Sequence, residues 1–283
     1  MQKIAETMPS ANKSDMARSM GISRAMLYYK HKRPLVDEEV KKQIEAVQTD
    51  NPGYGHKRIA LELKLNKKRI LRVMNKFKIK PYRTRVAKPR KEKDEGRQES
   101  RFKNEIEAFC PIRPNIVWVT DFTFIKFQNK FIYLATVMDL YTREIIGWNI
   151  SRYHTKDLVL GAFIDALNKT KAIPVYLHSD QGSEYDCQEY ITLAKRYRII
   201  ISHSRKSHPW ENGYLESFYS TFKVDLGDVD RFEELGELIE EIHSTIHYYN
   251  NKRIHGKLKM SPIKFREKNQ RILRESLSEE MGT

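Results

Sequence analysis

Three carboxylates in the second half of the chain have residue types and spacing suited to binding divalent cations. They are Asp121 in VWVTDFTF, Asp180 in YLHSDQGSEY and Glu216 in NGYLESFYSTFK. The last two are separated by 35 residues, and Lys223 follows Glu216 by seven positions. Hard cations such as Mg²⁺ prefer oxygen ligands, and a pair of such ions that cuts phosphodiesters needs carboxylates converging from separate elements. If the three acids meet in the fold, they predict metal-dependent chemistry on DNA.

The elements that must position these acids form an α/β pattern. Apolar and β-branched runs predict five strands, and amphipathic runs predict three helices among and after them. The expected strands are 117–127, 131–140, 144–150, 175–177 and 199–202, and the expected helices are 158–168, 187–196 and 212–226. The order βββαβαβα with a mixed five-stranded sheet resembles the ribonuclease-H-like arrangement, although a fold alone does not give a function.

Each acid has a defined place on these elements. Asp121 lies in the first strand, where a lone acid is costly to bury unless it is paired or binds metal. Asp180 follows the end of its strand, where ligand groups gather in open α/β sheets. Glu216 borders the apolar stripe of the last helix. Taken singly, Asp180 also fits an ordinary turn and Glu216 a solvated helix face, but their joint occurrence favours a metal site at one end of the sheet.

Two other residues near this helix are candidates for contact with DNA. Lys223 lies two helical turns after Glu216, roughly 10 Å along the axis, which is too far for a direct ion pair. We expect it to touch a phosphate of bound DNA instead. Trp118 and Trp148 are expected to pack inside the protein, whereas Trp210, in the loop before the helix, is the tryptophan that could touch DNA.

The positive charge of the chain is concentrated at its N-terminal end. The 283 residues carry a net charge of +15. Residues 1–103 hold 28 Lys and Arg against 12 Asp and Glu, whereas residues 104–283 hold 24 against 25. This distribution indicates a polyanionic partner for the N-terminal part, and double-stranded DNA is the expected one.

Two helical units are predicted in this basic part. In residues 1–35 a short helix runs to Met20, Gly21 makes a turn, and Ser23 caps a second helix that carries Arg24. This is a helix-turn-helix pattern, although a helical hairpin with no DNA role fits the same residues. Residues 36–82 predict three helices, the last of them capped by Asn66.

The third helix of the second unit has an apolar stripe opposite a basic face, as expected for a helix that enters the major groove. The alternative is that its Lys and Arg side chains only solvate a surface helix. Further candidates lie in the first unit, in the helix at 212–226 and the loop before it, and in the tail. The candidate DNA-binding residues are Lys223, Arg24, Lys57, Arg58, Lys67, Lys68, Arg69, Arg72, Lys206, Trp210 and Arg253.

The remaining boundaries follow from composition. Residues 83–104 are polar and basic and predict a linker, and residues 105–227 the catalytic domain. Residues 228–283 predict a helical extension, with an amphipathic helix at 230–250. Cys110 and Cys187 are far apart and lack metal-ligand spacing, which disfavours a disulfide framework and a structural zinc. No apolar run approaches the ~18 residues of a membrane span, so a soluble intracellular protein is expected.

Several motifs together resemble the DDE superfamily of transposases and retroviral integrases. The resemblance is closest to the OrfB-type transposases of the IS-three family of bacterial insertion sequences, and it covers nearly the whole chain. It is carried by YGHKRI, WVTDFTF, LHSDQGSEY, ISHSRKSHPWENGYLESFYSTFK and YYNNKRIHGKLKMSP. The pairs Ser207-His208 and Trp210-Glu211 depart from the small residues and the aromatic-Asp pair usual in that loop, and no leucine-zipper heptads are visible.

This resemblance implies specific chemistry and partners. Asp121, Asp180 and Glu216 would bind two Mg²⁺ per active site, for which Mn²⁺ substitutes, and Lys223 would be the trailing basic residue. The implied substrates are the terminal inverted repeats and target DNA, cut at the 3′ end and joined by strand transfer in a homodimer or higher oligomer. The implied location is the bacterial cytoplasm, at the nucleoid. Whether the product of an upstream reading frame is also required stays open.

Three alternatives were weighed against this interpretation. A non-catalytic DNA-binding protein, either a domesticated transposase or a repressor, has no need of three converging acids. A ribonuclease H proper has no need of two N-terminal DNA-reading units. A retroviral-type integrase would carry a zinc-binding His/Cys domain at its N-terminus. The role of Arg253 and His255 in the YYNNKRIHG motif stays open between DNA contact and attachment of the tail to the catalytic core.

Overall fold

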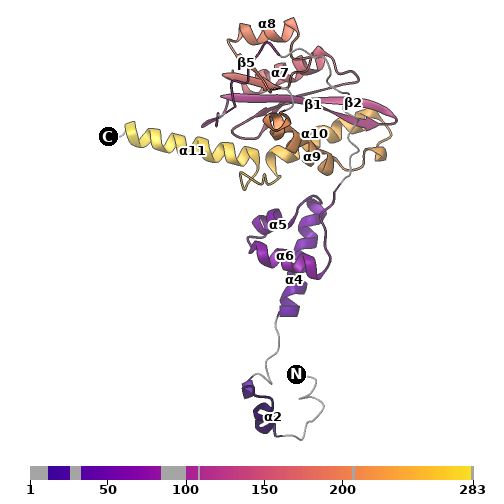
Figure 1. The fold of residues 1–283 in the computed structure, drawn as a ribbon, viewed down its shortest axis with the longest axis vertical. Coiled ribbons are helices and arrows are strands. Elements are labelled where there is room, and N and C mark those ends of the chain that lie inside the picture. The colour runs from indigo at the N-terminus through magenta and orange to yellow at the C-terminus, as the bar shows by residue number, and fades with distance from the viewer. Residues whose placement is uncertain (1–11, 26–32, 84–99, 108, 206–207, 282–283) are drawn as a thin grey trace.

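The chain forms small N-terminal helical units and a larger α/β body (Figure 1). The structure, a computed structural model, describes residues 12–25, 33–83, 100–107, 109–205 and 208–281. The predicted linker therefore falls largely outside the described residues. None of the helices in the described ranges is long and apolar enough to cross a membrane.

A mixed five-stranded sheet organises the body. Its strand order is β3-β2-β1-β4-β5, with β1, β2 and β3 antiparallel and β1, β4 and β5 parallel. Gln128 and Asn129 turn β1 into β2 with positive φ angles, which agrees with the turn expected there. The strands are β1 (Val117–Phe127), β2 (Lys130–Asp139), β3 (Ile145–Ser151), β4 (Tyr176–Ser179) and β5 (Ile200–His203). The predicted meander and the two later strands are thus confirmed.

Helices cover both faces of the sheet (Figure 1). Odd-numbered apolar residues of β1, such as Val119 and Ile125, share a core with one pair of helices, whereas Trp118 faces the other pair. Because side chains alternate along a strand, Asp121 belongs to the first of these faces. That face packs on α9 (Gly213–Leu226) and α10 (Leu235–Asn251), and the opposite face on α7 (Lys156–Thr170) and α8 (Gln188–Arg196).

Gly147 allows α7 to lie directly on β3. A Cβ at this position would meet Ala162 O and Ala166 N at 2.5 Å each. Both atoms belong to the backbone and cannot rotate away, so we expect Gly147→Ala to destabilise the protein by about 1–3 kcal/mol through overpacking. Thermal or urea unfolding measures the change.

Gly236 provides the matched control for this substitution. It lies in α10, and a Cβ there has no heavy atom within 4 Å. Gly236→Ala should be neutral or stabilise by about 0.5–1 kcal/mol, because alanine loses less backbone entropy in a helix. Equal effects of the two substitutions would contradict the close packing of α7 on β3.

The first C-terminal helix begins later than the sequence indicated. Residues directly after Gly227 form a short 3₁₀ turn, η2 (Val229–Arg231), with Asp228 accepting a hydrogen bond from Asp230 N. Helix α10 starts only at Leu235, where Glu234 and Glu237 form a capping box. The prediction of a helix from Asp230 was wrong in its start, because these local caps delay the helix to Leu235. The basic tail forms α11 (Pro262–Met281), which projects from the body.

The second N-terminal unit contains the three predicted helices. Asn66 caps the third, accepting a hydrogen bond from Lys68 N at 2.8 Å. The helices are α4 (Arg33–Asp50), α5 (His56–Glu62) and α6 (Lys67–Lys76). Their apolar core, which contains Ile44, Ile59 and Ile70, also takes in Ile254 from the segment after α10. This unit therefore shares part of its core with the body.

The first N-terminal unit is described only in part. Helix α2 (Lys13–Ser19) is capped by Asn12, and Gly21 follows with a φ of +63°. A second helix starts at Arg24, as expected, and residues 26–32 lie outside the described ranges.

Candidate active site

Asp121 and Asp180 come from neighbouring parallel strands. Strand β1 pairs with β4 so that Val117 lies beside Tyr176 and Val119 beside His178. The same register continued by two residues places Asp180 beside Asp121, at the spacing of adjacent strands, about 4.8 Å between backbones. Strand β4 ends at Ser179, so Asp180 stands at its carboxyl end while β1 continues past it.

Helix α9 brings Glu216 to the same face. The Tyr219 hydroxyl donates to Asp121 O at 2.6 Å and is 2.8 Å from Thr136 Oγ1. Thr136 is the residue opposite Asp121 on β2. Glu216 precedes Tyr219 by three residues and so lies on the same side of the helix. Tyr219 therefore fixes the Glu216-bearing face of α9 against β1 at Asp121.

The charges of the three acids interact. Burial raises the pKa of Asp121 well above its ordinary value, and the neighbouring Asp180 and Glu216 carboxylates raise it further. A hydrogen bond from Phe122 N to Asp121 Oδ1 at 2.8 Å acts in the opposite direction and lowers the pKa. Like charges held this close favour protonation unless a cation lies between them.

This donor set suits a hard divalent cation. All three ligand groups supply carboxylate oxygen, which Mg²⁺ and Mn²⁺ accept, and no thiol or imidazole is needed. Within the described residues, no three His, Cys, Asp or Glu side chains are grouped as a ready-made ion site. The three carboxylates therefore do not close on one point.

Neighbouring groups limit what else can enter the site. Gly182 N donates to Asp180 Oδ1 at 3.0 Å, and a Cβ on Gly182 would come within 3.1 Å of that oxygen. The buried Tyr185 has its pKa raised by burial and by the charges of Asp121 and Asp180, so it stays neutral beside them. Sequence reasoning missed Tyr185 and Tyr219. The i, i+3 spacing of Tyr219 from Glu216 was the available signal for the latter.

Lys223 lies further along α9, half-buried. Its Nζ is 4.5 Å from the centre of the Phe124 ring, and burial lowers its pKa. Among the described residues it forms no ion pair. Its expected contact with a DNA phosphate remains a prediction.

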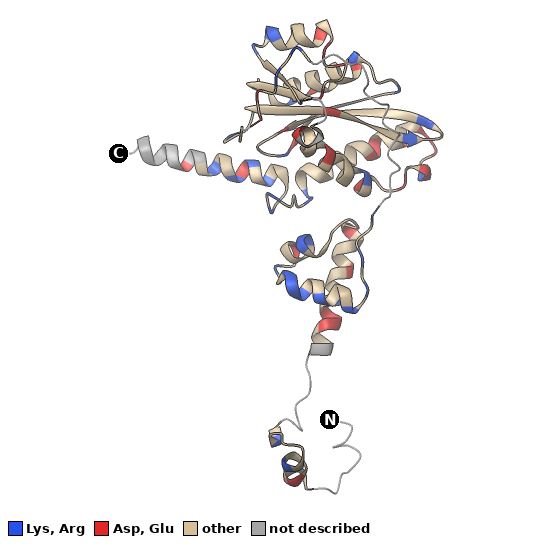
Figure 2. Ribbon diagram, viewed as in Figure 1, with Lys and Arg blue, Asp and Glu red and all other residues tan. Residues whose placement is uncertain are grey.

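The candidate DNA contacts of the N-terminal units have different environments. Arg24, Lys57, Lys67 and Lys68 are exposed, Arg69 is half-buried, and basic residues line α5 and α6 in Figure 2. Arg72 instead forms a bidentate pair with Asp37, at 2.6 and 2.8 Å, and Lys76 joins the same carboxylate at 3.0 Å. The basic face of α6 is therefore partly neutralised by α4, which the sequence pattern did not indicate.

Two further candidates lie between the second unit and the body. Arg58 Nε donates to Ile254 O at 3.0 Å, and Arg253 is only 3% exposed and paired with Asp225. These placements favour attachment of the tail over direct DNA contact by Arg253. Lys206 and the side chain of Trp210 lie outside the described residues.

We expect Tyr219→Phe to lower the free energy of unfolding by about 1–3 kcal/mol. The substitution removes the donor to Asp121 O and the hydrogen-bond partner of the buried Thr136 hydroxyl. Tyr190→Phe is the matched control, because the Tyr190 hydroxyl is buried with no hydrogen-bond partner among the described residues. Urea unfolding of both variants measures the difference, and an equal loss in the two would contradict the role of Tyr219.

The parallel β1–β4 pair with two acids at one level, and a helix bringing a third, define an integrase-type catalytic core. The integrase core domain family matches residues 111–209, and a second integrase core family matches residues 197–262. The putative transposase InsK of insertion sequence IS150 from Escherichia coli K12 is 32% identical over 89% of this chain and 92% of its own length. The chain belongs to the IS-three family of transposases.

A second transposase and two solved structures are also similar to this chain. Transposase InsF of insertion sequence IS3A from Escherichia coli K12 is 32% identical over 42% of each chain. The simian T-cell lymphotropic virus intasome, solved in complex with the PP2A regulatory subunit B56 gamma, aligns over 79% of this chain and 74% of that chain, with a TM-score of 0.50 and 14% identity, which confirms the fold. The HTLV-2 integrase catalytic core in complex with magnesium aligns over 55% of this chain and 98% of that chain, with 18% identity and a TM-score of 0.45.

Proposed function

We propose that the chain is a Mg²⁺-dependent DDE transposase that binds the terminal inverted repeats of its element, cleaves their 3′ ends and joins them to target DNA. The observation that carries this proposal is the placement of the three acids. Asp180 directly follows β4, the parallel neighbour of the strand that carries Asp121. The Tyr219 hydroxyl, three residues after Glu216, bonds to the Asp121 backbone. Three acids from a strand, a strand end and a helix act on one another at one face of the sheet. A protein that only binds DNA gains nothing from this repulsion.

The residues of the chain have distinct parts in this reaction. Asp121, Asp180 and Glu216 would hold Mg²⁺, which supplies Lewis acidity toward the scissile phosphate and an activated water or 3′-OH. Tyr219 fixes the backbone of Asp121, and Gly182 N orients the Asp180 carboxylate. Lys223 would contact a phosphate near the cut. Because two ends must be held together, a homodimer or larger assembly would perform the joining.

Comparing DNA binding with cleavage tests this function. The chain is incubated with a labelled duplex that carries an end of its own element, in Mg²⁺, in Ca²⁺ and in EDTA. We expect a band shift in all three conditions and 3′-end cleavage with Mg²⁺. A chain that shifts the duplex but does not cleave it even in Mg²⁺ would favour the alternative, a non-catalytic DNA-binding protein.

A further inference from the structure

Arg143 is a buried cation that has no anionic partner among the residues that the structure describes. It lies in the turn after β2, where its N donates to Asp139 O at 2.8 Å and its O accepts from the Tyr249 hydroxyl at 3.0 Å. Its side chain is packed against the ring of Tyr214, 4.0 Å from the ring centre, and the residue is only 6% exposed. Among the described residues no carboxylate pairs with it, and its Nη1 has no hydrogen-bond partner.

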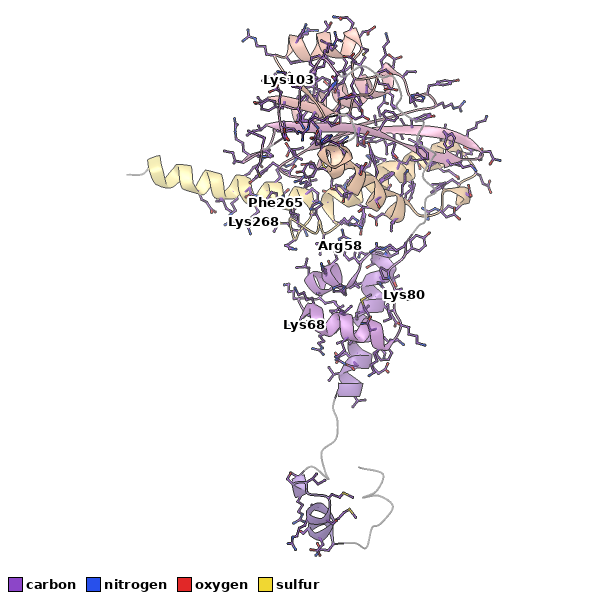
Figure 3. All side chains as sticks on the ribbon, viewed as in Figure 1. Arg58, Lys68, Lys80, Lys103, Phe265 and Lys268 are labelled. Carbon is purple, nitrogen blue, oxygen red and sulfur yellow. The ribbon has the colours of Figure 1, made fainter. Side chains whose placement is uncertain are left out.

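The charged residues that line the pocket beside Arg143 are all basic. It has a volume of about 150 Å³ and lies between α9, the turn after β2 and the segment after α10. No Asp or Glu is among its lining residues, whereas four further basic side chains are: Arg58, Arg253, His255 and Lys257. In Figure 3, Arg58 stands on the side of the second unit that faces the body. Three separate parts of the chain thus supply positive groups to one cavity.

The neighbouring groups confirm the positive field in this pocket. Burial, together with the charges of Arg143, Arg58, Arg253 and Lys257, lowers the pKa of His255 to about 4. The imidazole is therefore neutral, and its buried Nδ1 has no hydrogen-bond partner among the described residues. Arg253 has Asp225 as its counter-ion, but Arg143 has none.

This arrangement requires an anion. An arginine cannot lose its proton in a protein, and burying an unpaired charge is costly. The cavity has room for a phosphate group, since a water molecule takes only about 30 Å³ of liquid. The planar guanidinium is suited to bind phosphate oxygens with two parallel hydrogen bonds.

We propose that this pocket binds a backbone phosphate of duplex DNA through Arg143 and Lys257. The inference rests on the proposed function, which supplies DNA as the ligand. The bound phosphate would touch α5 of the second unit through Arg58 as well as the catalytic body. Binding of the duplex would thereby fix the second unit, which recognises DNA, relative to the acids that cut it.

The salt dependence of DNA binding tests the pocket. Affinity for a short labelled duplex is measured in EDTA over a range of salt concentrations for the whole chain and for Arg143→Gln and Lys257→Gln. Each variant is expected to reduce the slope of log affinity against log salt by about one, the value of one lost phosphate contact. The double variant should also lose about one, because both side chains bind the same phosphate.

Controls keep this test decisive. Lys195→Gln on the far-side helix α8 should leave the slope unchanged, and Lys257 is exposed, so its variant should fold even if Arg143→Gln does not. Unchanged slopes in the pocket variants would overturn the proposal, even if inorganic phosphate raised the melting temperature of the unaltered chain. If the slope of log affinity against log salt fell by about two in the double variant, the two side chains would bind different phosphates, which would overturn the shared site.

The EDTA assay is independent of catalysis, so the two proposals can fail separately. A chain that cleaves DNA with Mg²⁺ but shows unchanged slopes retains the proposed function and loses the pocket. A chain with the expected slopes but no cleavage retains the pocket and loses the catalytic assignment. Absence of DNA binding by the unaltered chain would overturn both.

Discussion

Asp180→Asn is expected to abolish Mg²⁺-dependent cleavage and strand transfer while leaving DNA binding intact. A cation site of this kind supplies several kcal/mol of transition-state stabilisation, and a loss of about 4 kcal/mol is a rate decrease of about 10³-fold. Asp121→Asn and Glu216→Gln should have the same effect. The measurement is single-turnover cleavage of a labelled element end at saturating protein, with band shifts run on the same samples.

The matched control is Asp186→Asn, at a position six residues after Asp180. The Asp186 side chain is 48% exposed and forms an ion pair with Arg101. We expect cleavage by this variant within about fivefold of the unaltered chain, since an exposed pair is worth about 1 kcal/mol or less. If Asp180→Asn retained full strand transfer with Mg²⁺, the assignment of the metal site would be wrong.

Stability gives an independent readout for Asp121. Because the pKa of this carboxyl is raised in the folded protein, its ionised form destabilises the fold at neutral pH without metal. Asp121→Asn is therefore expected to raise the melting temperature in EDTA while removing activity. A substitution that merely damaged the fold would lower both.

Arg253→Met is expected to destabilise the protein by about 3–5 kcal/mol, the typical result of breaking a buried ion pair from one side. The side chains of Arg253 and Asp225 are 3% and 7% exposed, and Arg253 lowers the pKa of Asp225, which burial raises. Without Arg253 a buried carboxylate remains. Urea unfolding measures the loss.

The pH dependence of this loss has a definite sign. Without Arg253 the pKa of Asp225 rises further above its unfolded value, so the folded state binds more protons and stability falls as pH increases. The destabilisation should therefore be smaller at mildly acidic pH than at neutral pH. Replacing both partners, with Arg253→Met and Asp225→Leu together, should recover most of the stability. A double variant as unstable as Arg253→Met would contradict this explanation.

The fold was predictable where local patterns decide it. The strands, the helices of the second N-terminal unit and the Asn66 cap follow from alternation, amphipathicity and capping residues within short windows. The start of α10 was missed because an Asp228 turn and a Glu234 capping box compete with apolar periodicity over the same residues.

The site was predictable in its acids but not in its supports. Asp121, Asp180 and Glu216 could be placed on a strand, a strand end and a helix from sequence alone. The pairing of Arg72 with Asp37 and of Arg253 with Asp225 could not, since each pair joins residues far apart in the chain. The same holds for Arg143, whose lack of a counter-ion appears only when its surroundings are known.

The most direct test of the metal site is anomalous diffraction from crystals of the chain grown with an element-end duplex and Mn²⁺. We predict Mn²⁺ peaks bound by the carboxylate oxygens of Asp121 and Asp180, with Glu216 as a further ligand. The peaks should disappear in Asp180→Asn. Mn²⁺ bound elsewhere while the three acids carry none would contradict the central claim that they form one catalytic metal site.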